Sequence, residues 1–251
     1  MGSRVEGAGV ELAYRERGAG PPVLLVHGMA ADAAGWDSAL DALAAEARAI
    51  AYDRRGYGES GAPEPYERTT VNEQAEDAAA LLRALDAAPA VLWAEDFGAL
   101  VALDLLGRHA SLVRGAVLVA PPLFALRPEA TEPLAEERLA LEDALREHGP
   151  EAAVERWLAG RLPAASPARL ARARAAHRAF FADYGGLASW PVTRRELRAI
   201  AAPVAVLAGE APAPHVRATA AALAGLLPGA LAPEVTGEPL AAVRRLLART
   251  A

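Results

Sequence analysis

The residue with the greatest catalytic potential in this 251-residue sequence is Asp96, which lies between an apolar run at residues 90–93 and a helix-forming segment. The run is typical of a buried strand, so the chain should turn sharply from strand to helix at the aspartate. Such a turn holds its apex side chain above the edge of a sheet, and it needs small residues on both sides because strand and helix nearly touch. Ala94 and Gly98 meet this need. We call residues 94–98 the elbow.

The composition limits the chemistry that this chain can perform. It contains no cysteine, and apart from five histidines all of its basic side chains are arginine. Disulfides, thiolate nucleophiles, thiolate metal sites and Schiff-base lysines are therefore excluded, and we expect neither a metal nor a cofactor. A net charge of −6 argues against nucleic acid or an anionic membrane as a partner. Without a secretory signal or an apolar run near the ~18 residues of a membrane span, a cytoplasmic protein is expected.

Strand and helix patterns alternate along most of the chain. Apolar runs at residues 23–26, 47–52, 90–93, 115–119 and 203–208 are separated by helix-forming segments. This alternation predicts an α/β fold with a parallel sheet and right-handed crossovers, preceded by a half-exposed antiparallel strand at residues 10–16. The fold should end with a short segment at residues 231–235 and a helix at 239–247.

Residues 123–190 interrupt this pattern. They are rich in alanine, arginine and glutamate, contain five prolines between residues 128 and 167, and show no strand periodicity. We therefore predict a sheet core formed by residues 1–122 and 191–251, with residues 123–190 inserted as a helical cap.

Several motifs besides the elbow resemble the α/β-hydrolase superfamily. They are residues 25–28 (LVHG), residues 53–60 (DRRGYGES) and the Arg-His pair at 108–109, and they follow the family's order and spacing over nearly the whole chain. The resemblance implies an α/β-hydrolase fold, with a mostly parallel central sheet flanked by helices and an inserted helical cap. It also implies an oxyanion hole formed by the backbone amides of Met29 and Phe97.

An aspartate at the apex, followed by an aromatic residue and glycine, is similar to the haloalkane dehalogenase and epoxide hydrolase branch. There the carboxylate attacks carbon and forms an ester, which water activated by a histidine then hydrolyses. The family's histidine precedes the last helix, but residues 233–239 (PEVTGEP) contain none, and the acid spacing after residues 203–208 is also altered. Loss of a general base costs about two to four decades of rate.

Three functions remain open on these grounds. The expected one is a non-hydrolytic enzyme of secondary metabolism in which Asp96 acts as general acid/base on a hydrophobic small molecule, by cyclisation, epoxide opening, isomerisation or elimination. The second is a hydrolase of the epoxide hydrolase or dehalogenase type, with Asp96 as nucleophile and a relocated base. The third is a pseudoenzyme that binds a ligand under its cap. Simultaneous loss of the histidine and its acid favours the first.

Other residues could assist Asp96. His27 and His215 are candidates for a relocated base, although a histidine at position 27 also commonly braces backbone. Glu95 lies beside the apex, and Glu210 is the acid nearest the usual acid position. Aromatic side chains are expected to line a substrate pocket, although aromatics at helical spacing are often core residues: Trp36, Phe124, Trp157, Phe180, Phe181, Tyr184 and Trp190.

Overall fold

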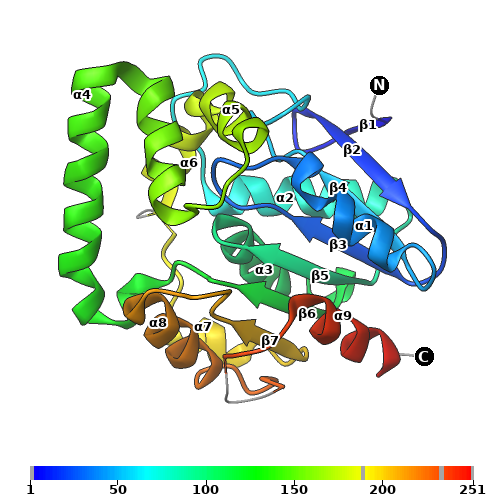
Figure 1. Ribbon diagram of the computed structural model, residues 1–251. Coiled ribbons are helices and arrows are strands. Elements are labelled where there is room, and N and C mark those ends of the chain that lie inside the picture. The colour runs from blue at the N-terminus through cyan, green and yellow to red at the C-terminus, as the bar shows by residue number, and fades with distance from the viewer. Residues whose placement is uncertain (1–2, 188–189, 232–234, 250–251) are drawn as a thin grey trace.

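The computed structural model describes residues 3–187, 190–231 and 235–249. At its centre is a seven-stranded sheet with the order β1-β2-β4-β3-β5-β6-β7 (Figure 1). β2 pairs antiparallel with both β1 and β4, and all the other neighbours are parallel. The predicted α/β fold with a mostly parallel sheet is confirmed.

The strands follow the apolar runs of the sequence closely. They are β1 (Ser3–Glu6), β2 (Glu11–Arg17), β3 (Pro22–Val26), β4 (Arg48–Tyr52), β5 (Ala90–Glu95), β6 (Val113–Val119) and β7 (Val204–Leu207). The parallel strands are buried at nearly every position because helices cover both faces of the sheet, which is why they are continuous apolar runs. β1 was not predicted, because its four residues are mostly exposed and carry no apolar pattern.

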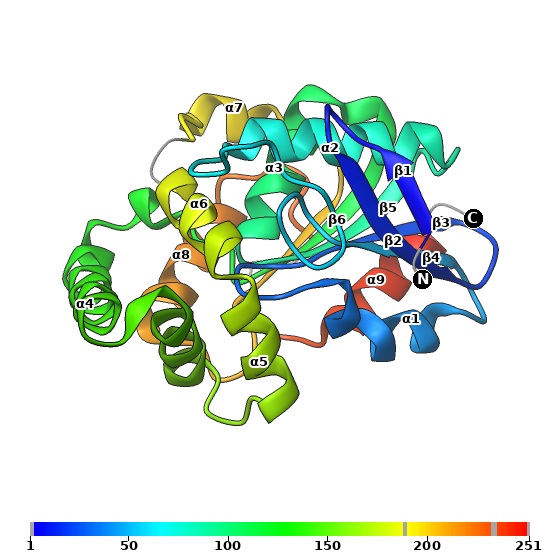
Figure 2. The same cartoon turned by 90° about the horizontal axis from the view of Figure 1, so that it is seen from above.

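Helices form a layer on each face of the sheet (Figure 2). The core helices are α1 (Asp37–Leu43), α2 (Val71–Ala84), α3 (Phe97–Arg108), α7 (Arg194–Ala199), α8 (Pro214–Ala224) and α9 (Pro239–Ala248). Buried side chains of α2 and α3 belong to one apolar cluster, and those of α1 and α9 belong to a second cluster on the opposite face. Residues 232–234, part of the segment predicted at 231–235, lie outside the described residues.

The segment at 123–190 is helical, and its described residues contain no strand. After two 3₁₀ turns, Phe124–Leu126 and Pro128–Ala130, it consists of α4 (Thr131–Arg161), α5 (Pro167–Ala175) and α6 (His177–Leu187). α4 reverses direction at Gly149, whose φ of 80° is not helical and which precedes Pro150. The two arms of α4 therefore lie side by side, next to α5 and α6 (Figure 1). A long helical insertion of this kind matches the predicted cap.

A buried ion pair joins α6 to the sheet core. The Arg54 guanidinium donates to Asp183 Oδ2 at 2.6 Å, and both side chains are completely buried. Tyr57 donates its hydroxyl to the same oxygen at 2.7 Å, and Gln74 donates to Asp183 Oδ1 at 2.7 Å. Buried charges are tolerated where they are paired and hydrogen-bonded in this way. The contact fixes α6 to the core.

Within the described part of the chain, no helix is long and apolar enough to cross a membrane.

Candidate active site

The elbow has the strained geometry that its sequence predicts. Asp96 connects β5 to α3 with φ 50° and ψ −124°, a backbone conformation that costs free energy for any residue with a Cβ. A Cβ added to Gly98 would lie 2.4 Å from the Val26 carbonyl oxygen, and one on Gly28 would lie 2.7 Å from Asp96 Cβ. Gly98 is therefore needed for α3 to approach the end of β3, and Gly28 is needed for the loop after β3 to approach Asp96.

We expect Gly98→Ala to lower the free energy of unfolding by about 1–3 kcal/mol, because the added methyl group overlaps the backbone of β3. Urea denaturation measures this. Gly107→Ala in the same helix is the matched control, since a Cβ there has no neighbour within 4 Å. It should be neutral or stabilising by up to about 1 kcal/mol. Equal losses in the two variants would contradict the close approach at the elbow.

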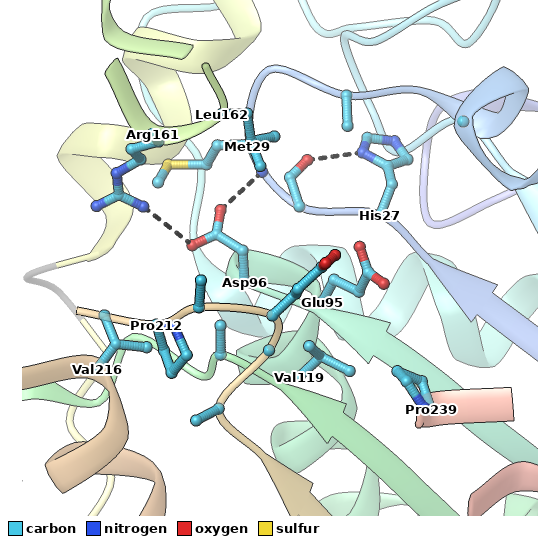
Figure 3. Close-up of a pocket in the computed structure, with 18 of the residues that line it drawn as sticks. His27, Met29, Glu95, Asp96, Val119, Arg161, Leu162, Pro212, Val216 and Pro239 are labelled. Carbon is cyan, nitrogen blue, oxygen red and sulfur yellow. Dashed lines mark hydrogen bonds and ion pairs between the residues drawn. The ribbon is translucent and has the colours of Figure 1, made fainter. Parts of the chain in front are cut away.

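The Asp96 carboxylate has two partners that stabilise its negative charge. The Met29 amide donates to Oδ2 at 3.0 Å, and a guanidinium nitrogen of Arg161 lies 3.9 Å from Oδ1 (Figure 3). The side chain remains 21% exposed. The carboxylate is thus held by one hydrogen bond and one longer charge contact, and it lines the cavity described below.

The two amides expected to form an oxyanion hole lie at the elbow. The Met29 amide already donates to the apex carboxylate itself. Phe97 is the first residue of α3, and the first amides of a helix lack acceptors within the helix. The structure therefore shows the Met29 amide holding an Asp96 oxygen, whereas the contribution of the Phe97 amide stays a prediction.

Arg161 is held in front of Asp96 by the cap. Its guanidinium donates to both carboxylate oxygens of Glu137, with a shortest distance of 2.9 Å, and lies 4.4 Å from the Trp157 ring centroid. Trp157 in turn donates its indole N–H to Glu137 at 3.0 Å. These contacts join the two arms of α4. Nothing in the sequence distinguished Arg161 from the other arginines of the cap.

Asp96 opens onto a cavity of about 1200 Å³ between the core and the cap. Three of the predicted aromatic residues, Trp36, Phe124 and Trp157, line it. The expectation that four others do so is corrected: Phe180, Phe181, Tyr184 and Trp190 are absent from its wall.

Packing explains these four positions. Phe180 is fully buried and its ring centroid lies 4.7–5.7 Å from those of Trp157, Phe181 and Tyr184. Trp190 donates its indole N–H to Asp104 of α3 at 3.0 Å. Helical spacing indicated that α6 has an aromatic face, but that face packs within the cap and does not contact the cavity.

The cavity wall is charged as well as apolar. Its arginines come from the cap and from α8, and its acids come from both the core and the cap. The basic residues are Arg161, Arg169, Arg172 and Arg217; the acidic residues besides Asp96 are Asp32, Glu95, Glu137, Glu210 and Glu238. Arg172 is paired with Asp32 at 3.0 Å. In the described part of the chain no group of three or more His, Asp or Glu residues could hold a metal ion.

His27 is a brace for the backbone. The Arg54 amide donates to its Nε2 at 3.0 Å, and Nδ1 lies 2.8 Å from the Gly28 carbonyl oxygen, to which it must donate. Burial and, after it, the charge of Arg54 lower the pKa of His27 well below its usual value. Both ring nitrogens are occupied and the ring is buried, so His27 has no free nitrogen to activate water.

His215 and Glu210 line the same cavity, which they enter from the chain that follows β7. His215 is in the first turn of α8, and its ring packs against Phe124 with centroids 5.6 Å apart. Glu210 is exposed where it lines the cavity. No hydrogen bond joins either residue to Asp96 in the described part of the chain.

Glu95 ends β5 and lines the same cavity as Asp96. Burial raises the pKa of its carboxyl group; the Arg169 guanidinium and the nearby Trp93 indole N–H oppose this effect, and the charge of Asp96 adds to it. The sequence left the direction of the Glu95 side chain open. Figure 3 shows it directed away from Arg161 and Met29, the two partners of Asp96.

Comparisons with known proteins agree on the family to which this chain belongs. Residues 21–207 match the model of the alpha/beta hydrolase fold family. A 2-(acetamidomethylene)succinate hydrolase of Mesorhizobium japonicum is 34% identical over 161 residues, 64% of this chain and 55% of that protein. An epoxide hydrolase of Caballeronia sordidicola is 41% identical over 92 residues, 36% of this chain and 28% of that protein. The chain thus spans about half or less of the length of these curated relatives.

A solved alpha/beta hydrolase from Sphaerobacter thermophilus superposes on 99% of this chain and 100% of its own, with a TM-score of 0.73 and 25% identity. The match of the family model covers well over half of the sequence, and the sheet, the elbow and the helical insertion have the arrangement that the motifs predicted. The chain belongs to the α/β-hydrolase-fold family, whose members among its relatives are mostly hydrolases.

Proposed function

We propose that this protein is an enzyme in which the Asp96 carboxylate attacks an electrophilic carbon of a small molecule, as in dehalogenases and epoxide hydrolases. One observation carries the proposal: the Met29 amide holds Oδ2, while Oδ1 lies on the side of Arg161 and the cavity. Oδ1 would bond to the substrate carbon. Oδ2 would then become the carbonyl oxygen of the ester and keep its amide donor throughout.

Arg161 would stabilise the charge that leaves the carbon. In epoxide opening the Oδ1–C bond forms as the ring C–O bond breaks, and the resulting alkoxide takes a proton from water. In dehalogenation the halide departs with the bonding electron pair. A guanidinium fixed by Glu137 and Trp157 needs little reorganisation to face either anion.

Acid/base chemistry at Asp96, the role expected from the sequence, needs no ester intermediate and hence no base to hydrolyse one. A second candidate function is therefore an isomerisation or elimination in which Asp96 only removes a proton. It is favoured by one observation, that no hydrogen bond joins Asp96 to a histidine in the described part of the chain.

We infer the substrate class from the cavity wall, which contains both apolar and charged side chains. Trp36, Phe124 and Trp157 offer apolar surface, and the arginines and acids offer polar contacts. We propose a substrate with an apolar body and at least one polar group, which extends the original expectation of a hydrophobic small molecule.

Intact-mass measurement tests the nucleophilic role directly. The protein is incubated with styrene oxide and, separately, with 1-bromobutane, and then digested for peptide mapping. We expect a covalent adduct on the peptide that contains Asp96, or the diol or alcohol that its hydrolysis releases. Asp96→Asn should give neither. An unmodified protein without product across a panel of epoxides and alkyl halides would favour the proton-abstraction alternative.

A further inference from the structure

An ester on Asp96 must be removed by activated water, and the family's histidine is missing from the loop before α9. Resting on the proposed nucleophilic function, we propose that Glu95 is the general base that activates this water. The role is distinct from that of Asp96, because Glu95 would act only in the second half of the reaction.

The position of Glu95 in the sheet supports this role. Alternate residues of a strand point to the same face, so Glu95 shares its face with Trp93. Trp93 packs against Trp36, with ring centroids 5.1 Å apart, in the apolar cluster that also contains buried side chains of α9. Glu95 therefore leaves the end of β5 on the side of the sheet that α9 covers.

The loop that would carry the family's histidine lies on this same side. Thr236, Gly237 and Glu238 lead directly into α9 and line the cavity together with Glu95. Figure 3 shows Glu95 and Pro239, the first residue of α9, on one side of Asp96, whereas Met29 and Arg161 lie on the other. Glu95 thus lines the cavity on the side of Asp96 where the family's base is missing.

Its carboxyl group also lacks the close ion-pair partner that other acids of the cavity have. Asp32 and Glu137 are paired with Arg172 and Arg161, and Glu210 and Glu238 are exposed. Glu95 is less exposed and forms no ion pair within 4.0 Å in the described part of the chain, since Arg169 acts on it only at longer range. Burial raises the pKa of this carboxyl group, and a more basic carboxylate is a better general base near neutral pH.

The step balances without another reactant. Water attacks Cγ of the Asp96 ester and gives a proton to Glu95, while the Met29 amide holds the negative charge on Oδ2. The Cγ–Oδ1 bond then breaks, and the departing alkoxide takes the proton from Glu95. Asp96 releases one proton to solvent, so that both carboxylates return to their starting state.

Glu95→Gln is the decisive variant, assayed with styrene oxide by single-turnover kinetics and intact mass. Adduct formation should proceed at the wild-type rate, and adduct hydrolysis should slow by about 10²–10⁴-fold, so that the ester accumulates on Asp96. Glu95→Asp keeps a carboxyl group and should recover part of the hydrolysis rate. This recovery would show that substitution at position 95 leaves the site folded. Asp143→Asn, at an exposed acid of the cap that does not line the cavity, should behave as wild type.

Two results would overturn the inference while leaving the nucleophilic function in place. One is hydrolysis of the adduct at the wild-type rate in Glu95→Gln. The other is accumulation of the ester in His215→Ala but not in Glu95→Gln, which would make His215 the base. If neither adduct nor product forms in the wild-type protein, the proposed function itself fails and the role of Glu95 fails with it.

Discussion

Asp96→Asn is expected to lower turnover by about three to six decades, the loss typical of removing a catalytic nucleophile. Asparagine keeps the size of the side chain and an oxygen that can accept the Met29 amide, so the elbow should remain intact. It lacks the negative charge that faces Arg161 and cannot form an alkyl ester. The measurement is kcat/KM for whichever probe the wild-type protein consumes.

A matched acid variant makes the result specific. Asp143→Asn removes an exposed carboxylate of the cap that does not line the cavity, and its kcat/KM should stay within a factor of about three. Retained turnover in Asp96→Asn would show that Asp96 is not the reacting group. Unchanged ligand affinity in both variants, with no turnover in the wild-type protein, would instead favour the ligand-binding pseudoenzyme.

Asp183→Ala is expected to lower the free energy of unfolding by about 3–5 kcal/mol, because it leaves the buried Arg54 charge without its carboxylate. The same change removes the acceptor of the Tyr57 hydroxyl and one acceptor of Gln74. Urea denaturation followed by circular dichroism measures the loss. It should be accompanied by faster proteolysis within α6, because the ion pair fixes this helix to the core.

A surface variant and a double variant serve as controls for Asp183→Ala. Asp143 forms an exposed pair with Arg146, and Asp143→Ala should change stability by no more than about 0.5 kcal/mol. The double variant Arg54→Met/Asp183→Leu should lose less than Asp183→Ala, because it leaves no unpaired charge. A loss below about 1 kcal/mol in Asp183→Ala would show that water reaches Arg54 and that α6 is not fixed to the core by this pair.

The framework of the site could be predicted because it depends on local patterns. The apolar runs gave the parallel strands, and the small residues around Asp96 gave the turn from β5 into α3. α7 was not predicted, although Thr193 and Glu196 form the capping box that begins it. The capping box is visible in the sequence, but the helix that follows it is too short to show a periodic pattern of apolar residues.

The charged surroundings of Asp96 could not be predicted because they depend on how the cap packs against the core. Arg161 is 65 positions from Asp96 in sequence, and it reaches the carboxylate only because α4 reverses at Gly149. Tertiary packing also decides that Phe180 is buried in the cap while Trp157 lines the cavity. Helical spacing alone does not distinguish these two positions. These tertiary contacts decide which of the expected aromatic residues reach the cavity.

The site carries its own counter-ion. Arg161 lies in front of the Asp96 oxygen that would attack, so stray electrophiles meet a masked carboxylate in the resting protein. Glu137 and Trp157 hold the guanidinium at this position from the cap. A molecule that reaches Asp96 Oδ1 from the cavity would therefore also meet Arg161, so the pair would favour substrates that carry an anion or a dipole.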